Sequence, residues 1–108
     1  MKKQLLIFIF FLMGMGMSLA QQTIYVNAGA TGANNGTSWA DAYTDFQTAI
    51  NNASSDDAVW VAAGTYQPTN SGEYFSMKEG VKIYGGFDGT ETLLSERDWI
   101  NNVTTLKG

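Results

Sequence analysis

The carboxylates in the second half of the chain are the residues best suited to catalysis. They are Asp56, Asp57, Glu73, Glu79, Asp88, Glu91, Glu96 and Asp98. Two facing carboxylates could hydrolyse a glycosidic bond, and a basic residue beside bound Ca²⁺ could support a lyase reaction. Most of these acids stand in expected turns, which lie at the surface. We therefore assign no catalytic residue, and Arg97 is interpreted as part of a local ion pair or as a brace for its turn.

Side chains that could bind a metal are few. The sequence contains no His and no Cys, which removes the commonest general base and the commonest metal ligand. Asn34, Asn35 and Asp41 could offer oxygen atoms to Ca²⁺, but their loop lacks the alternating acidic pattern of a calcium site. A solvated turn is the simpler interpretation. The sequence thus predicts no metal and no cofactor, with Ca²⁺ in this loop as the alternative.

Three tryptophans could contact either a ligand or the core. Trp60 alternates with Val59 and Val61 along an expected strand, so its side chain should face away from theirs. An exposed Trp could stack on a sugar, whereas packing against a helix or an outer loop is the simpler explanation. Trp39 and Trp99 are predicted to be core or cap residues.

A repeat is the feature expected to position these side chains. The segment 59–64 recurs at 81–86 and more weakly at 103–108, and each copy begins with Val and ends with Gly, 22 residues after the last. Each copy reads as a short strand broken by its glycine. A period of this length is typical of stacked architectures, and it leaves too little room for a crossover helix. The pattern predicts an all-β fold, a parallel β-helix solenoid.

An amphipathic helix is predicted directly before the first repeat. It should begin at Ser38, which resembles the first residue of a capping box. Its apolar stripe comprises Ala42, Phe46, Ala49, Ile50 and Ala53. Because the end of a solenoid exposes unpaired edge groups, we expect this helix to cap that end. The alternative is a helix packed on the side of a sheet.

The remaining segments are predicted from local composition. The segment 23–27 is rich in β-branched and aromatic residues and is expected to be a strand, followed by a loop at 28–37. A short strand is expected at 75–77. Between the second and third repeats, four apolar residues are expected to tuck inward: Leu93, Leu94, Trp99 and Ile100.

The N-terminus has the features of a secretory signal. A basic start, Lys2 and Lys3, precedes an apolar run and the small residues Ser18 and Ala20. This order predicts export with cleavage after Ala20, because the run is shorter than the ~20 residues that span a membrane. The predicted organisation is a signal peptide at 1–20, a strand, loop and capping helix at 21–57, and first coils at 58–108, incomplete at the C-terminus.

The charge of the predicted mature chain excludes two classes of partner. Without Lys2 and Lys3, four basic residues remain against ten acidic ones, so the net charge is −6. Such a chain lacks the basic surface that binds nucleic acid or anionic lipid. Any membrane contact is expected to come through the export signal alone.

Four segments resemble the N-terminal part of secreted bacterial β-helix proteins of the pectin-lyase-like type, including outer-membrane proteins of Bacteroidetes-type bacteria. They are 36–50, 59–66, 83–91 and 97–104, and they include Gly-Thr-Ser-Trp, Val-Trp-Val-Ala-Ala-Gly-Thr-Tyr, Ile-Tyr-Gly-Gly-Phe-Asp-Gly-Thr-Glu and Arg-Asp-Trp. The resemblance implies a right-handed parallel β-helix with a coil period of about 22 residues. It also implies a location outside the cell or at its surface. No functional residue can be carried over from the family.

Two functions are compatible with this reading. The first is a structural, adhesive or carbohydrate-binding protein of the cell surface, whose partner is a polysaccharide or another surface molecule and which continues into, or pairs with, further coils. The second is the N-terminal portion of a polysaccharide-degrading enzyme, a pectate-lyase-like lyase or a glycoside hydrolase. We expect no catalysis within these residues, because no pair of acids has an evident partner across the repeat.

Overall fold

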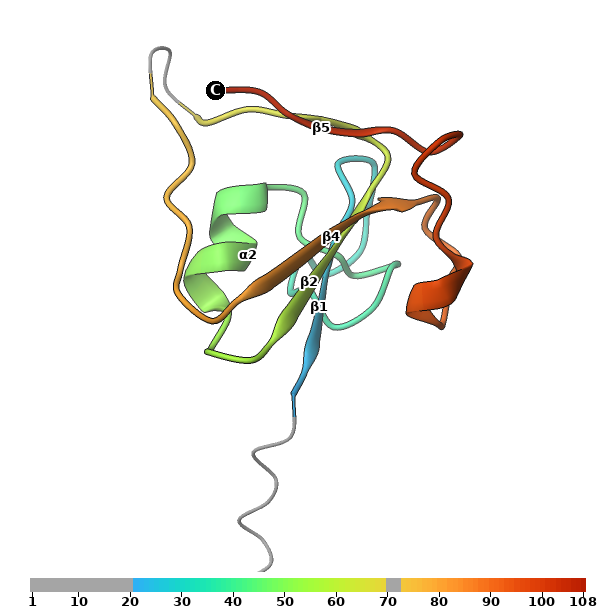
Figure 1. Cartoon of the computed structure of the whole chain (residues 1–108), viewed down its shortest axis with the longest axis horizontal. Helices are drawn as coiled ribbons and strands as arrows, with labels where there is room; N and C mark the ends of the chain where they lie inside the picture. The colour runs from blue at the N-terminus through green and yellow to red at the C-terminus, as the bar shows by residue number, and fades with distance from the viewer. Residues whose placement is uncertain (1–20, 70–72) are drawn as a thin grey trace, which may run out of the picture.

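A computed structural model describes residues 21–69 and 73–108 of the chain (Figure 1). The predicted signal peptide therefore lies outside the described residues. The elements are β1 (Thr23–Val26), α2 (Phe46–Asn52), β2 (Ala58–Ala62), β3 (Gly64–Tyr66), β4 (Lys82–Phe87), a 3₁₀ turn η3 (Leu94–Glu96) and β5 (Thr104–Leu106). Strands β1, β2 and β4 form one parallel sheet in that order, and β3 pairs with β5 in a second parallel sheet.

The predicted β-helix solenoid is wrong. The described residues form a small compact globule of two short parallel sheets and one α-helix. The 22-residue repeat is not the pairing register, because Val59 lies opposite Ile83 rather than Val81. The third copy of the repeat contributes β5, which pairs with β3 in the other sheet. Loop lengths and packing set these offsets, and sequence similarity between strands does not reveal them.

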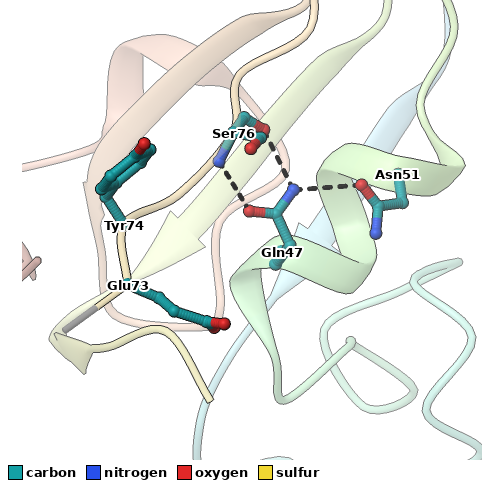
Figure 2. A pocket seen from close by; sticks show the side chains of 5 residues that line it. All are labelled: Gln47, Asn51, Glu73, Tyr74 and Ser76. Carbon is teal, nitrogen blue, oxygen red and sulfur yellow. Dashed lines mark hydrogen bonds between the residues drawn. The ribbon is translucent and has the colours of Figure 1, made fainter. Parts of the chain in front are cut away.

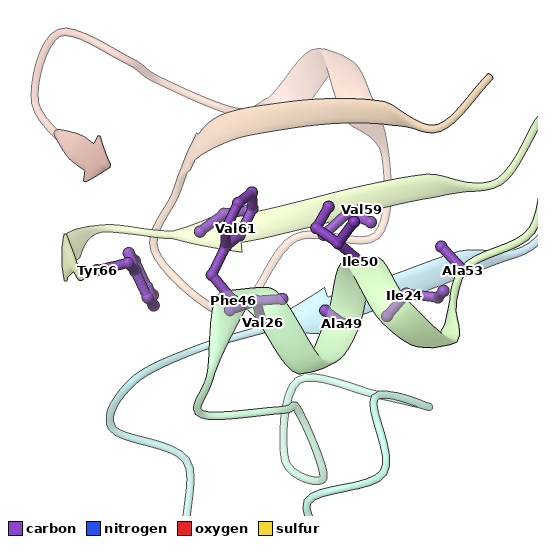
Figure 3. Close-up of a cluster of buried hydrophobic side chains, with 9 residues drawn as sticks. All are labelled: Ile24, Val26, Phe46, Ala49, Ile50, Ala53, Val59, Val61 and Tyr66. Carbon is purple, nitrogen blue, oxygen red and sulfur yellow. The ribbon is translucent and has the colours of Figure 1, made fainter. Parts of the chain in front are cut away.

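Strand β2 is the centre of the fold, and all five of its residues are buried. On one face of the sheet, Val59 and Val61 pack with Ile24 and Val26 of β1 against α2 (Figure 3). On the other face, the ring of Trp60 stacks on that of Phe87, with centroids 4.7 Å apart and an interplanar angle of 9°. A strand covered on both faces reads as a continuous apolar run, and Ala-Val-Trp-Val-Ala fits that pattern.

Helix α2 begins later than predicted and lies in a different place. Its N-cap is Asp45, whose carboxylate accepts a hydrogen bond of 2.9 Å from the amide of Thr48. Ser38 accepts the amide of Asp41 in a turn that does not continue as a helix. The predicted apolar stripe is buried as expected. It packs against one face of the β1–β2–β4 sheet (Figure 3), so the alternative, a helix on the side of a sheet, was the right one.

The segment before α2 bends and turns along the edge of β1 and does not form a helix. Tyr43 bridges to Val26 in parallel, and its amide donates to the carbonyl of Tyr25 at 2.9 Å. These tertiary contacts outweigh the local helical preference of the residues from 38 to 44, a preference worth only tenths of a kcal/mol per residue.

The two sheets meet at an irregularity between β2 and β4. The register shifts between Trp60 and Ala62, and the hydroxyl of Thr104 occupies this place. Its Oγ1 donates to the carbonyl of Val61 at 3.1 Å and accepts the amide of Gly86 at 3.0 Å. A Cβ on Gly85 would lie 2.8 Å from the Cβ of Thr104, so the approach of β5 requires a glycine there.

Several local predictions also differ from the structure. The segment 75–77 is not a strand. Three of the four apolar residues expected to point inward are exposed, namely Leu93, Trp99 and Ile100. Leu94 packs against the buried cluster of Ala58, Trp60 and Phe87. The chain from Leu93 to Ile100 forms a 3₁₀ turn and then a turn closed by the carboxylate of Asp98. Because backbone hydrogen bonds fix these two turns, the three exposed side chains point to solvent.

Candidate functional site

A groove of about 600 Å³ lies between α2 and the segment that leads into β4. Its lining comes from both sides: Gln47 and Asn51 from the helix, and Glu73, Tyr74 and Ser76 from the facing segment (Figure 2). We call residues 73–78 the strap. The two walls of the groove, α2 and the strap, are separated in the chain by β2 and β3.

Gln47 joins the helix to the strap. Its side-chain oxygen accepts the amide of Ser76 at 2.8 Å, and its Nε2 donates to the carbonyl of Ser76 at 3.0 Å. The same Nε2 donates to Oδ1 of Asn51, one turn along the helix (Figure 2). Gln47 thus pairs with the strap as a neighbouring strand would, because a primary amide offers one acceptor and two donors.

Two further contacts hold the strap in place. The ring of Phe75 meets that of Phe46 edge to face, with centroids 4.9 Å apart. The ammonium of Lys78 donates to the carbonyls of Asn51 and Ala53 at 3.0 and 2.7 Å, at the C-terminal end of α2. A cation at this end is favoured by the helix dipole and by the orphan carbonyls. The strap is consequently fixed in its middle, at Phe75 and Ser76, and at its C-terminal end, at Lys78.

Alternation along the fixed strap turns Tyr74 outward. Because Phe75 points into the core, Tyr74 is 80% exposed. Glu73 lies beside it, across the groove from the amides of Gln47 and Asn51 (Figure 2). The groove combines an exposed aromatic ring with the Asn51 amide, the Ser76 hydroxyl and the Glu73 carboxylate. These groups can hydrogen-bond a polyhydroxylated ligand while the ring covers its apolar face, whereas both N–H groups of Gln47 are already engaged.

The groove is not arranged for the hydrolysis considered from the sequence. Its described lining includes one carboxylate, that of Glu73, whereas glycosidases of the usual kind need two acids on either side of the bond. Within residues 21–69 and 73–108, no group of three acids or other metal-binding side chains lies together.

The acids singled out from the sequence are dispersed, and two of them are buried. Asp57 accepts the amides of Gln22 and Ser54 at 3.0 and 2.9 Å, and so ties the start of β1 to that of β2. Glu91 accepts the amides of Asp88 and Gly89 at 2.8 and 3.1 Å. The expectation that turn acids face solvent is wrong for this pair, because each replaces water with backbone donors.

Three other acids close surface turns through their own backbone. Donation from Thr90 holds the pKa of Asp88 below its usual value, and the amides of Leu93 and Thr92 do the same for the pKa of Glu96. Donation from the side chain and amide of Asn101 lowers the pKa of Asp98. Hydrogen bonds to the charged form produce each of these shifts. All three carboxylates have local structural roles.

Arg97 does not form the local ion pair that its neighbours suggested. Its guanidinium carbon lies 5.2 Å from the ring centroid of Tyr84 and 5.0 Å from that of Trp99. An ion pair nearby in sequence joins Lys82 to Asp56 at 3.9 Å. Arg97 instead stacks between two aromatic rings, since Glu96 and Asp98 are occupied by backbone amides.

The loop considered for Ca²⁺ uses its oxygen atoms internally. Oδ1 of Asn34 accepts the amide of Thr44, Oδ1 of Asn35 accepts that of Thr37, and Oδ1 of Asp41 accepts that of Ala33. Asn34 has a positive φ of 58°, a conformation that Asn tolerates better than most residues. These bonds shape the loop that lies on the edge of β1.

The burial of the three tryptophans differs in part from the prediction. Trp60 is buried, so the packing explanation is right and its role in sugar stacking is withdrawn. Trp39 packs in the same cluster, as predicted, and its Nε1 donates to the carbonyl of Glu91 at 2.9 Å. Trp99 is 63% exposed and is not a core residue. Sequence alternation correctly separated Trp60 from its valines, but it did not reveal that both faces of β2 are covered.

Sequence reasoning missed the groove. Gln47 and Asn51 lie on α2 outside its predicted apolar stripe. Their spacing of four residues puts both amides on one face. Nothing in the sequence indicated that the strap would return to this face, because that contact joins residues 29 apart.

Comparisons with known proteins do not place the chain in a family, because no family model, no curated protein and no solved structure matches it. No helix in the described part of the chain is long and apolar enough to cross a membrane.

Proposed function

We propose that this protein is exported and binds a neutral polysaccharide, without cleaving it, through the groove between α2 and the strap. The observation that carries the proposal is the combination of an 80% exposed Tyr74 with hydrogen-bonding groups on both walls of the groove. A sugar ring has an apolar face and a rim of hydroxyls, and an aromatic ring beside amides matches both.

Charge favours a neutral ligand over an acidic one. Glu73 lines the groove, and without residues 1–20 the chain has a net charge of −6. A polyuronate would bring further carboxylates to a site that already holds one, and like charges repel. A neutral glucan or xylan avoids this cost.

Binding can be tested by titration calorimetry with a soluble β-glucan, a xylan and polygalacturonate. We expect heat of binding with one or both neutral polymers and none with polygalacturonate. Replacing Tyr74 by Ala should weaken binding about tenfold, which corresponds to about 1.4 kcal/mol and lies within the range of an aromatic contact.

The matched control is Met77→Ala, because Met77 is also exposed on the strap but does not line the groove. It should bind as the unsubstituted protein does. Failure to bind either neutral polymer, or equal loss in both variants, would contradict the proposal. Release of reducing or unsaturated ends above a heat-treated control would show that the protein cleaves its ligand and would refute the non-catalytic part.

A further inference from the structure

The loop before α2 covers the β1 edge of the β1–β2–β4 sheet, whereas part of the β4 edge is left open. At the β1 edge, Tyr25 directs its backbone outward, and the loop before α2 satisfies it. The amide of Tyr25 donates to the carbonyl of Gly36 at 3.0 Å, and its carbonyl accepts the amide of Tyr43 at 2.9 Å. Another strand cannot pair with β1 while this loop is in place.

At the β4 edge, Ile83 is the corresponding residue. The amide of Lys82 donates to the carbonyl of Asp57 at 2.9 Å, on the β2 side. Because successive residues of a strand direct their backbone groups to opposite sides, Ile83 directs its amide and carbonyl away from β2. Among the backbone hydrogen bonds outside the ladders of residues 21–69 and 73–108, none involves Ile83.

The open part of this edge is short and partly apolar. Past Gly85 it is covered, because the amide of Asp98 donates to the carbonyl of Gly86 at 2.7 Å. Before that point, the side chains of Ile83, Val81 and Phe75 pack on the main core but remain half-exposed. The core that α2 closes on one side is thus incompletely covered at the β4 end.

We propose that a second copy of this chain pairs with this edge, with β4 antiparallel to β4 and the two Ile83 residues opposite each other on a two-fold axis. The blocked β1 edge excludes head-to-tail stacking of copies, so the same edge must serve both partners. A two-fold axis through that contact gives an antiparallel pair and a closed dimer. Each Ile83 then exchanges both of its backbone hydrogen bonds with the other.

The antiparallel arrangement also keeps like charges apart. In it, Lys82 of each copy lies opposite Tyr84 of the other and not opposite a second Lys82. The half-exposed apolar side chains of Ile83 meet across the axis and extend both cores.

Sedimentation of the purified protein from about 1 µM to 1 mM tests the proposal, because two backbone hydrogen bonds and a small apolar contact should give a weak, reversible dimer. Ile83→Pro removes the outward amide and spares the ladder with β2, where proline on a free edge is tolerated. It should raise the dissociation constant at least about tenfold, since each copy loses a hydrogen bond. Ile83→Lys, which would bring two ammonium groups together on the axis, should have at least the same effect.

The matched control is Leu106→Ser, an exposed apolar residue of the other sheet, which should leave the dimer unchanged. Circular-dichroism melts establish that each variant folds. If neither Ile83 variant folds, hydrogen exchange of the unsubstituted protein decides, because the Ile83 amide should become protected as protein concentration rises. A monomer throughout this concentration range, growth beyond a dimer, or a dimer unaffected by both Ile83 substitutions would overturn the proposal.

Discussion

Tyr66 provides the sharpest test of how the two sheets are joined. Its side chain is 4% exposed. The hydroxyl donates to the carbonyl of Ala62 at 2.9 Å and accepts the amide of Ala28 at 3.2 Å. One phenol therefore links β3, the end of β2 and the loop after β1. Replacing Tyr66 by Phe keeps the ring and removes both hydrogen bonds.

The expected cost follows from what the substitution leaves behind. The Ala62 carbonyl and the Ala28 amide lose their partner, and an unsatisfied buried polar group costs about 1–3 kcal/mol. For a domain of this size, each kcal/mol shifts the melting temperature by about 4–8 °C. We therefore expect the free energy of unfolding of Tyr66→Phe to fall by about 2 kcal/mol and the melting temperature by on the order of 10 °C.

Urea unfolding and thermal melts, followed by circular dichroism, measure both quantities. Tyr74→Phe is the matched control, because Tyr74 is 80% exposed and lies on the strap; its stability should change by less than about 0.5 kcal/mol. Equal stability of Tyr66→Phe and the unsubstituted protein would refute the inference that this hydroxyl joins the sheets.

The same phenol predicts a pH dependence. Burial raises the pKa of Tyr66 above its ordinary value of 10.0, and the hydrogen bond from Ala28 opposes this in part. The folded protein therefore holds the phenolic proton more tightly than the unfolded chain. The resulting stability is present below pH 10 and is lost as the pH rises through the folded pKa. This loss should be absent from Tyr66→Phe, which has no proton to release.

Three further predictions test the packing at Gly85 beside the register shift, the surface turns and the N-terminus. Gly85→Ala should destabilise the fold by about 1–3 kcal/mol in urea unfolding, because its Cβ would strike Thr104; an unchanged midpoint would contradict the packing of β5 on β4. The melting temperature should fall as the pH drops below the ordinary pKa values of 3.8 for Asp88 and Asp98 and 4.5 for Glu96, because the folded protein holds these pKa values lower. This loss of stability should shrink when Asn replaces the two aspartates and Gln replaces Glu96. N-terminal sequencing of exported protein should begin at Gln21, and retention of Met1 would show that the signal is not cleaved.

Local composition alone was enough to place most of the strands. β-Branched and aromatic runs predicted β1, β2 and β4 within a residue or two, and the apolar stripe from Ala42 to Ala53 was identified with its buried face. These features follow from short-range rules of alternation and helical periodicity, which act within one segment. The pairing of Asp45 with Thr48 is equally local, but Ser38 offered a competing start to the helix.

The pairing of those segments was decided only by the tertiary structure. Val59 meets Ile83, the third repeat joins the second sheet, and Trp60 is buried because the segment around Trp39 returns to cover it. The groove exists because Gln47 meets Ser76. Each of these contacts joins residues far apart in the chain, and the lengths and bonds of the intervening loops decide which ones form. The amino-acid sequence encodes those loops, but no periodic pattern in it reports where they lead.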